Sequence, residues 1–310
     1  MMRLSGLSRV LIVPALFLAG LSGGCELDLL SPMGQVGAEE KRLILTTVGL
    51  MLIVVIPVIA LTIFFAWRYR ASAQARYEPD WSHSSKIEVV VWGIPVLLIL
   101  IMGVMTWIST HKLDPYRPLD VPGKSLSVQV VALDWKWLFI YPEQGIAVVN
   151  EMAMPAGRAV DFSVTSDAVM NSFFIPQLGS QIYAMAGMKT KLHLIADHIG
   201  VYDGISSNYS GAGFSGMKFK AHAVSSQDFD AWVAKVKRDG RALDPASYAA
   251  LAKPSQNVPV TYYATVAPGW FETLLNKYRY SSSHHTPSGH SMPEGQMHSD
   301  GHDHNAMPAR

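Results

Sequence analysis

The sequence predicts a membrane α+β protein, in which a two-helix transmembrane hairpin is followed by an antiparallel β-sandwich and by short C-terminal helices. Three observations predict this fold class: two apolar runs of membrane-spanning length, a later region of short alternating strands, and helical periodicity near the end. With 49% hydrophobic and 16% charged residues, the 310-residue chain is too apolar for a soluble domain and too charged for a polytopic transporter. A formal net charge of +1 gives no reason to expect a nucleic-acid partner.

Residues 1–24 have the composition of a bacterial lipoprotein signal peptide. Two arginines precede an apolar stretch at 10–18, and small residues follow up to Cys25, the only cysteine of the chain. Ser22 departs from the pattern, because a large aliphatic residue is usual three positions before the modified cysteine. We expect the Cys25 thiol to carry a lipid anchor; the alternatives are an ordinary signal peptide and a buried, unmodified thiol.

Two apolar runs, 43–67 and 89–108, each contain the roughly 20 residues needed to cross a bilayer. The segment 68–87 between them carries more Lys and Arg than Asp and Glu, so we expect it to be a cytoplasmic loop. Residues 25–42 and everything after the second helix then lie outside. An exported, lipidated Cys25 requires the same orientation. We therefore expect a multi-pass protein of the bacterial inner membrane with its β-domain on the periplasmic side.

Residues 125–223 show the pattern of a β-sandwich. Apolar and polar residues alternate in short runs, such as 125–133, 158–165 and 189–195, and Gly, Pro, Asn and Asp separate these runs. Short alternating strands with turn residues between them are typical of an antiparallel sandwich of about a hundred residues.

Residues 226–280 are expected to form a helical region, in which Ser226 caps the first helix and further helices cover 245–253 and 268–278. Residues 281–310 have too few aliphatic side chains to fold and are expected to be a disordered tail. Histidine and methionine are frequent there, which leaves open weak copper or zinc binding, although no spacing fixes a coordination geometry. The histidines considered for such binding are His284, His285, His302 and His304.

Three segments resemble a known family. Residues 134–141 (Asp-Trp-Lys-Trp-Leu-Phe-Ile-Tyr), 171–176 (Asn-Ser-Phe-Phe-Ile-Pro) and 204–217 (Gly-Ile-Ser-Ser-Asn-Tyr-Ser-Gly-Ala-Gly-Phe-Ser-Gly-Met) resemble an aromatic stretch and two copper-ligand segments of subunit II of heme-copper respiratory oxidases. The likeness covers about residues 25–280 and is closest to the bo-type ubiquinol oxidases.

This resemblance implies a cupredoxin-like fold for residues 125–223. It implies subunit I and other membrane subunits as partners, together with membrane lipids, and ubiquinol as the substrate of the complex. The hemes and a mononuclear copper are expected in subunit I, and no cofactor is expected on this chain. The chain itself is expected to be structural rather than catalytic, although the complex is an oxidoreductase of aerobic respiration.

The resemblance also assigns positions to the dinuclear copper site of the cytochrome c oxidase branch. Where that branch has His, Cys, Glu, Cys, His and Met, this chain has Asn171, Ser206, Asn208, Ser210, Phe214 and Met217. A dinuclear copper centre needs bridging thiolates, and a serine hydroxyl stays protonated near neutral pH. We therefore expect no copper to bind here. An apolar quinol reaches subunit I through the bilayer, so the external copper relay is unnecessary.

Two further residues carry hypotheses from the resemblance. Glu88, at the start of the second membrane helix, resembles an acid proposed to feed protons into subunit I; the alternative is an ordinary solvated carboxylate at a helix start. Trp135 resembles a tryptophan that carries electrons in the copper-bearing branch. Without copper, we expect Trp135 to pack in the core or to contact subunit I.

Two other functions remain open from the sequence. The first is a stand-alone lipoprotein that binds or delivers copper through its tail, and the second is a true cytochrome c oxidase subunit. The second is disfavoured by Ser206 and Ser210, which replace the thiolates.

Overall fold

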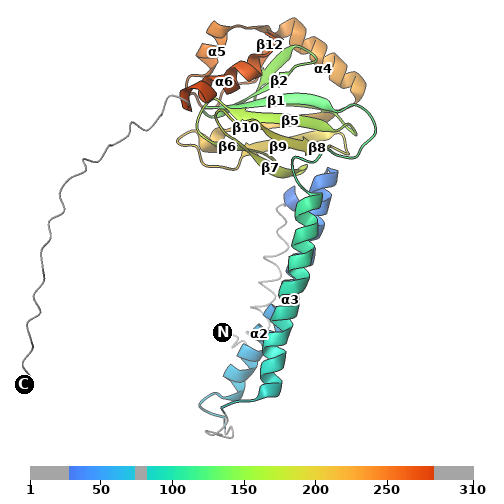
Figure 1. Cartoon of the computed structure of the whole chain (residues 1–310), viewed down its shortest axis with the longest axis vertical. Coiled ribbons are helices and arrows are strands. Elements are labelled where there is room, and N and C mark those ends of the chain that lie inside the picture. The colour runs from blue at the N-terminus through green and yellow to red at the C-terminus, as the bar shows by residue number, and fades with distance from the viewer. Residues whose placement is uncertain (1–27, 74–81, 283–310) are drawn as a thin grey trace, which may run out of the picture.

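The computed structural model describes residues 28–73 and 82–282. Two long helices lie side by side as a stalk and a β-domain covers one end of it, with the C-terminal helices on the far side of that domain (Figure 1). A short 3-10 turn, η1 (Asp28–Leu30), precedes the stalk. The predicted fold class of a helical hairpin, a β-sandwich and C-terminal helices is confirmed.

The stalk consists of α2 (Gln35–Arg68) and α3 (Ser85–Lys112). In the described residues these are the two helices long and apolar enough to cross a membrane. Both extend past the expected spans 43–67 and 89–108 toward the β-domain. There, Lys112 of α3 forms a 2.8 Å ion pair with Glu39 of α2, so charged turns continue each helix beyond its apolar part.

The β-domain contains two packed sheets. The larger sheet has the strand order β11-β12-β3-β2-β1-β5-β8 and the smaller sheet β4-β10-β9-β6-β7. Most neighbours are antiparallel, as predicted, but β1–β5, β4–β10 and β11–β12 are parallel pairs. The strands are β1 (Leu126–Leu133), β2 (Lys136–Tyr141), β3 (Ile146–Val149), β4 (Glu151–Pro155), β5 (Val160–Ser166), β6 (Asn171–Ile175), β7 (Gly179–Ala184), β8 (Thr190–Leu194), β9 (Gly200–Ser206), β10 (Lys218–Val224), β11 (Arg241–Leu243) and β12 (Thr261–Val266).

Strand β2 is buried on both faces, because side chains alternate across a sheet and both sides of this one are covered. Trp137 and Phe139 point between the sheets, where they meet Phe173 and Phe219, whose rings stack at 5.2 Å. Leu138 and Ile140 point to the opposite face of β2. There they join a second apolar cluster, which includes Tyr248 and Phe271 of the C-terminal region. This arrangement places the C-terminal region on the outer face of the larger sheet.

The C-terminal region is not wholly helical, so the prediction of a helical 226–280 is wrong in part. It contains α4 (Ser226–Asp239), α5 (Pro245–Leu251) and α6 (Trp270–Ser282), but also β11 and β12. The sequence of β12, Thr-Tyr-Tyr-Ala-Thr-Val, is rich in β-branched and aromatic residues, and it extends the larger sheet beside β3. The cap of α4 is Ser225 rather than Ser226, since the Ser225 hydroxyl accepts from Asp228 N at 3.1 Å.

The first turn of α2 is joined to the β-domain through backbone groups. Gly37 N donates to Leu178 O at 3.0 Å, a bond that satisfies a helix-start donor with a carbonyl of the domain. A Cβ at Gly34 would lie 2.2 Å from Ile195 O, so only glycine allows this approach. The Glu40 carboxylate accepts from the backbone N of Ser180 at 3.0 Å and from its hydroxyl at 2.5 Å. These contacts fix the β-domain on the end of α2.

Candidate functional site

The site begins where β6 and β9 lie side by side and antiparallel. Asn171 opens β6 and Ser206 ends β9, and both are buried. The Ser206 hydroxyl donates to Asn171 Oδ1 at 3.0 Å, with Asn208 O as a second acceptor at 3.3 Å. Three of the six positions expected from the copper-bearing branch therefore meet in one hydrogen-bonded group.

The amide groups of this site are used to hold two loops together. Asn171 Nδ2 donates to Val169 O at 3.0 Å, and Asn208 Nδ2 donates to Met170 O at 3.0 Å. The loop after β9 is thereby tied to the segment before β6. Asn171, Ser206 and Asn208 are neutral and contain no thiolate, so they offer a metal cation neither an anion nor a soft sulfur ligand.

The remaining three positions lie around the same loop. The Met217 side chain is buried, and Met217 O accepts from Ser206 N at 3.3 Å. Phe214 opens the short turn η2 (Phe214–Gly216) and packs edge-on against Tyr209, with ring centroids 5.5 Å apart. Ser210 Oγ is buried and has no hydrogen-bond partner among the described residues.

Trp135 lies against this loop. Its indole N–H donates to Ser210 O at 3.0 Å, and a Cβ at Gly213 would lie 2.4 Å from its ring. Trp135 occupies the turn between β1 and β2 with φ at 61°, a left-handed conformation that is uncommon for a large residue. The half-buried ring therefore packs against residues 210–213 of the loop after β9.

The residue after Trp135 was missed by sequence reasoning. The Lys136 side chain is buried, and its ammonium donates to Asp134 O at 3.1 Å, Lys253 O at 2.9 Å and Ser255 Oγ at 2.6 Å. Burial lowers the pKa of this ammonium. The three bonds satisfy all of its donors and fix the β1–β2 turn that carries Trp135.

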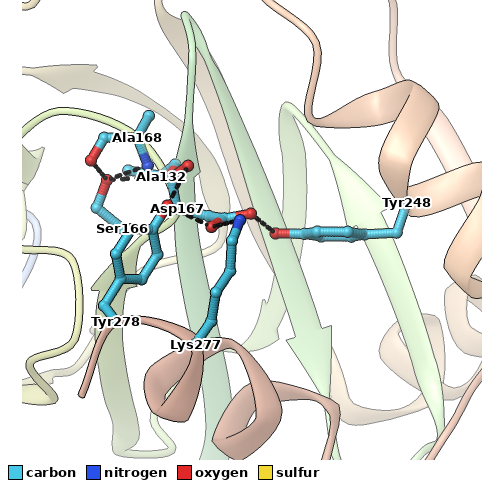
Figure 2. Close-up of polar contacts among 7 residues, drawn as sticks. All are labelled: Ala132, Ser166, Asp167, Ala168, Tyr248, Lys277 and Tyr278. Carbon is cyan, nitrogen blue, oxygen red and sulfur yellow. Dashed lines mark hydrogen bonds and ion pairs between the residues drawn. The ribbon is translucent and has the colours of Figure 1, made fainter. Parts of the chain in front are cut away.

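Asp167 forms a second group that the sequence did not indicate (Figure 2). Its carboxylate, with the side chain 1% exposed, accepts from the Tyr248 hydroxyl, the Lys277 ammonium and the Tyr278 hydroxyl, each at 2.7 Å. Its backbone N donates to Ala132 O at 2.9 Å. Asp167 lies between β5 and β6, so this group connects α5 and α6 to the segment that leads into Asn171.

The other predicted site residues lie elsewhere. Glu88 is in the first turn of α3, at the end far from the β-domain, where its Oε1 is 2.9 Å from His83 Nδ1 and both side chains are 56% exposed. Cys25 and the four tail histidines lie outside the described residues. Across residues 28–73 and 82–282, no group of three or more His, Cys, Asp or Glu is arranged to hold a metal ion.

Two family models match the chain. The model described as "Cytochrome C oxidase subunit II, periplasmic domain" matches residues 142–224, and the "COX Aromatic Rich Motif" matches residues 237–281. The second match covers the region that Asp167 connects to the domain.

Similar proteins cover most of the chain. It is 63% identical to cytochrome bo(3) ubiquinol oxidase subunit 2 of Pseudomonas putida, over 86% of this chain and 85% of that protein. It is 61% identical to the protein of the same name in Pseudomonas aeruginosa, over 87% and 80% of the two chains. It is 57% identical to ubiquinol oxidase subunit 2 of Acetobacter aceti, over 88% and 89%.

Proposed function

This chain belongs to the ubiquinol oxidase subunit 2 family, and from that membership we propose that it is the subunit of a quinol oxidase that carries no copper and supports the catalytic subunit I. The complex is an oxidoreductase, which would oxidise a membrane quinol and reduce oxygen. The hemes and the mononuclear copper of the reaction would reside in subunit I.

The observation that carries this proposal is the hydrogen bond from Ser206 to Asn171. A dinuclear copper centre requires thiolates, and this site holds a hydroxyl bonded to the Asn171 amide and two amides that donate to backbone carbonyls. The chain's only cysteine is Cys25, far from the site in sequence. The residues present therefore do not fit the copper centre, and this domain is not proposed to carry electrons.

The orientation follows from charge and from the position of the domain. Arg68 and Arg70 follow the apolar part of α2, and Lys86 lies in the first turn of α3, at the end of the stalk away from the β-domain. Positive residues of short loops favour the cytoplasmic side, which places the β-domain in the periplasm of a bacterial inner-membrane protein. A lipid on Cys25 would add an anchor on the same side as the domain.

Subunit I would be contacted by the exposed apolar faces of α2 and α3 and by the loop that holds Trp135. Trp135 is proposed as an aromatic contact rather than an electron carrier, because no copper precedes it in this chain. Glu88 is proposed as a proton-uptake residue. Its support is its position at the cytoplasmic end of α3, where its carboxylate is open to water and pairs with an imidazole.

The test is co-purification of the tagged full chain in mild detergent, followed by a heme spectrum and by quinol-driven oxygen uptake. A quinol oxidase subunit brings down a heme-bearing membrane subunit, and trimming residues 281–310 leaves oxygen uptake unchanged. A preparation that contains no heme contradicts the proposal. Loss of function on trimming the tail would instead support a stand-alone copper lipoprotein, which the similar proteins do not favour.

A further inference from the structure

A cleft of about 270 Å³ lies between α2 and α3 at the end of the stalk that joins the β-domain. Both helices contribute to its walls, so it follows the groove between them rather than the surface of one. The residues that line it are Glu39, Arg42, Leu43, Thr46, Met105, Ile108, Ser109, Lys112 and Leu113.

The lining changes from charged to apolar along the stalk. Glu39, Arg42 and Lys112 lie toward the β-domain, while Leu43 and Met105 lie toward the apolar part of the helices. The 25 residues after Arg42, 43–67, rise about 37 Å at 1.5 Å per residue, which spans a hydrocarbon core of ~30 Å. Arg42 therefore lies at the level of the lipid headgroups, and the apolar walls lie at the level of the first acyl carbons.

The charge of Arg42 acts on Glu39 only at a distance, because that carboxylate is bonded directly to Lys112. Lys112 is paired with Glu39 at 2.8 Å, whereas the Arg42 guanidinium makes no ion pair or hydrogen bond with any described residue. The hydroxyl of Thr46 bonds back to Arg42 O at 2.8 Å and does not occupy the guanidinium. Arg42 thus presents a planar fork of donors at the charged end of an apolar groove.

We propose that this cleft binds one phospholipid of the periplasmic leaflet, with its phosphodiester on Arg42 and the start of an acyl chain in the groove between α2 and α3. A guanidinium fits phosphate oxygens in a two-point contact. The apolar walls of the groove would contact the first methylenes of the acyl chain. The Glu39–Lys112 pair holds the helices at the spacing that forms the cleft. This inference rests on the membrane orientation proposed above and does not depend on the identity of the electron donor.

The alternative is that Arg42 meets headgroups only as any cation near a membrane does. Lys41 tests this, because it is the adjacent residue of α2, carries the same charge, lies at the same depth and does not line the cleft. If attraction is general, removing the charge of Lys41 or of Arg42 weakens lipid retention equally. If the cleft is a built site, only the loss of Arg42 weakens it.

The experiment compares the assembled complex containing the full wild-type chain, Arg42→Gln or Lys41→Gln. Each complex is stripped with detergent, titrated with dioleoyl phosphatidylglycerol or phosphatidylethanolamine, and examined by native mass spectrometry. Arg42→Gln should weaken retention of the most tightly held lipid about tenfold, as expected for one lost charge-assisted contact, and Lys41→Gln should leave it unchanged. Equal retention by the three complexes overturns the proposal.

A photoactivatable phospholipid then locates the bound lipid. Labelling within 42–46 or 105–109 of this chain, reduced by Arg42→Gln, supports the cleft, whereas labelling confined to other subunits overturns it. Recovery of the wild-type complex in the membrane fraction is checked first. A chain found in the soluble fraction would contradict the membrane orientation, which makes that failure distinct from failure of the lipid site.

Discussion

The hydroxyl of Ser206 donates to the side-chain oxygen of Asn171 at 3.0 Å and so joins the end of β9 to the start of β6. Most buried polar atoms are hydrogen-bonded in folded proteins, and this bond pairs one buried side-chain oxygen with another. The loop after β9 is held further by Asn208 and by the ring of Trp135. This hydrogen-bonded network thus holds together the strand ends and the loop at this end of the domain.

Replacing Asp167 by Asn should release the C-terminal region. The change removes the anion that three donors share, and hydrogen bonds to a buried charged group contribute about 1.5–3 kcal/mol each. We expect faster hydrogen exchange and proteolysis in α6, while β1 and β2 stay protected. Asp230→Asn is the matched control, since Asp230 is an exposed carboxylate of α4. Equal protection of α6 in both variants would argue against the connection.

The same group should open at alkaline pH. The nearby Asp167 carboxylate raises the pKa of Lys277, and burial followed by the Asp167 charge raises the pKa of Tyr248 and Tyr278 above their usual values. A raised folded-state pKa means that these groups keep their protons to a higher pH in the folded state than in the unfolded state. The stability from these groups is therefore complete below pH 10 and is lost as the pH rises through the folded pKa values. Hydrogen exchange of α6 measured across this window should show the loss.

Tyr248→Phe serves as the comparison for this pH dependence. The variant lacks one of the titrating hydroxyls, so its α6 should be less protected at neutral pH and should change less between neutral and alkaline pH. A wild-type α6 whose protection is flat through the alkaline window would contradict the account.

Gly34→Ala should weaken the joint between α2 and the β-domain. The added Cβ would approach Ile195 O to 2.2 Å; the backbone of residue 34 fixes the Cβ and the oxygen is itself a backbone atom, so neither can rotate away. Gly49→Ala, inside α2 where nothing lies within 4 Å of the new Cβ, should be neutral or stabilising because alanine favours helix. Thermal denaturation of the full chain in detergent, separated from subunit I, is the measurement, and a lower midpoint only for Gly34→Ala is the expected result.

Glu88→Gln should slow quinol-driven oxygen uptake at saturating quinol without changing the heme content, if protons enter subunit I at this carboxylate. The amide keeps the shape of the side chain but cannot carry a proton between water and the membrane subunit. Glu143→Gln, a carboxylate in the β-domain paired with Lys124, is the control. Unchanged turnover in Glu88→Gln would leave this residue as a solvated helix-start carboxylate.

The sequence predicted the parts of the fold that composition and periodicity determine. Apolar length located the two membrane helices, but their charged ends, such as Gln35 to Arg42, are helical because they pack on the domain and on each other. The strand at 261–266 was missed because its role depends on pairing with β3, more than a hundred positions earlier in the chain.

The candidate site was predictable only in part for a similar reason. The resemblance located Asn171, Ser206 and Asn208, and the structure brings these three together. Asp167 could not be found this way, since its partners lie 81 to 111 positions away, outside the three segments that carried the resemblance. Lys136 stands inside a recognised aromatic segment, yet its burial depends on the distant acceptors Lys253 and Ser255.

The most direct test of the central claim is the ratio of copper to heme in the purified complex, measured by metal analysis together with its quinol-driven oxygen uptake. We predict active complex whose copper is accounted for by the mononuclear site of subunit I, and no copper bound by the separated subunit that contains Asn171 and Ser206. Two additional copper ions that stay with this chain, and that are lost when its β-domain is removed, would contradict the account.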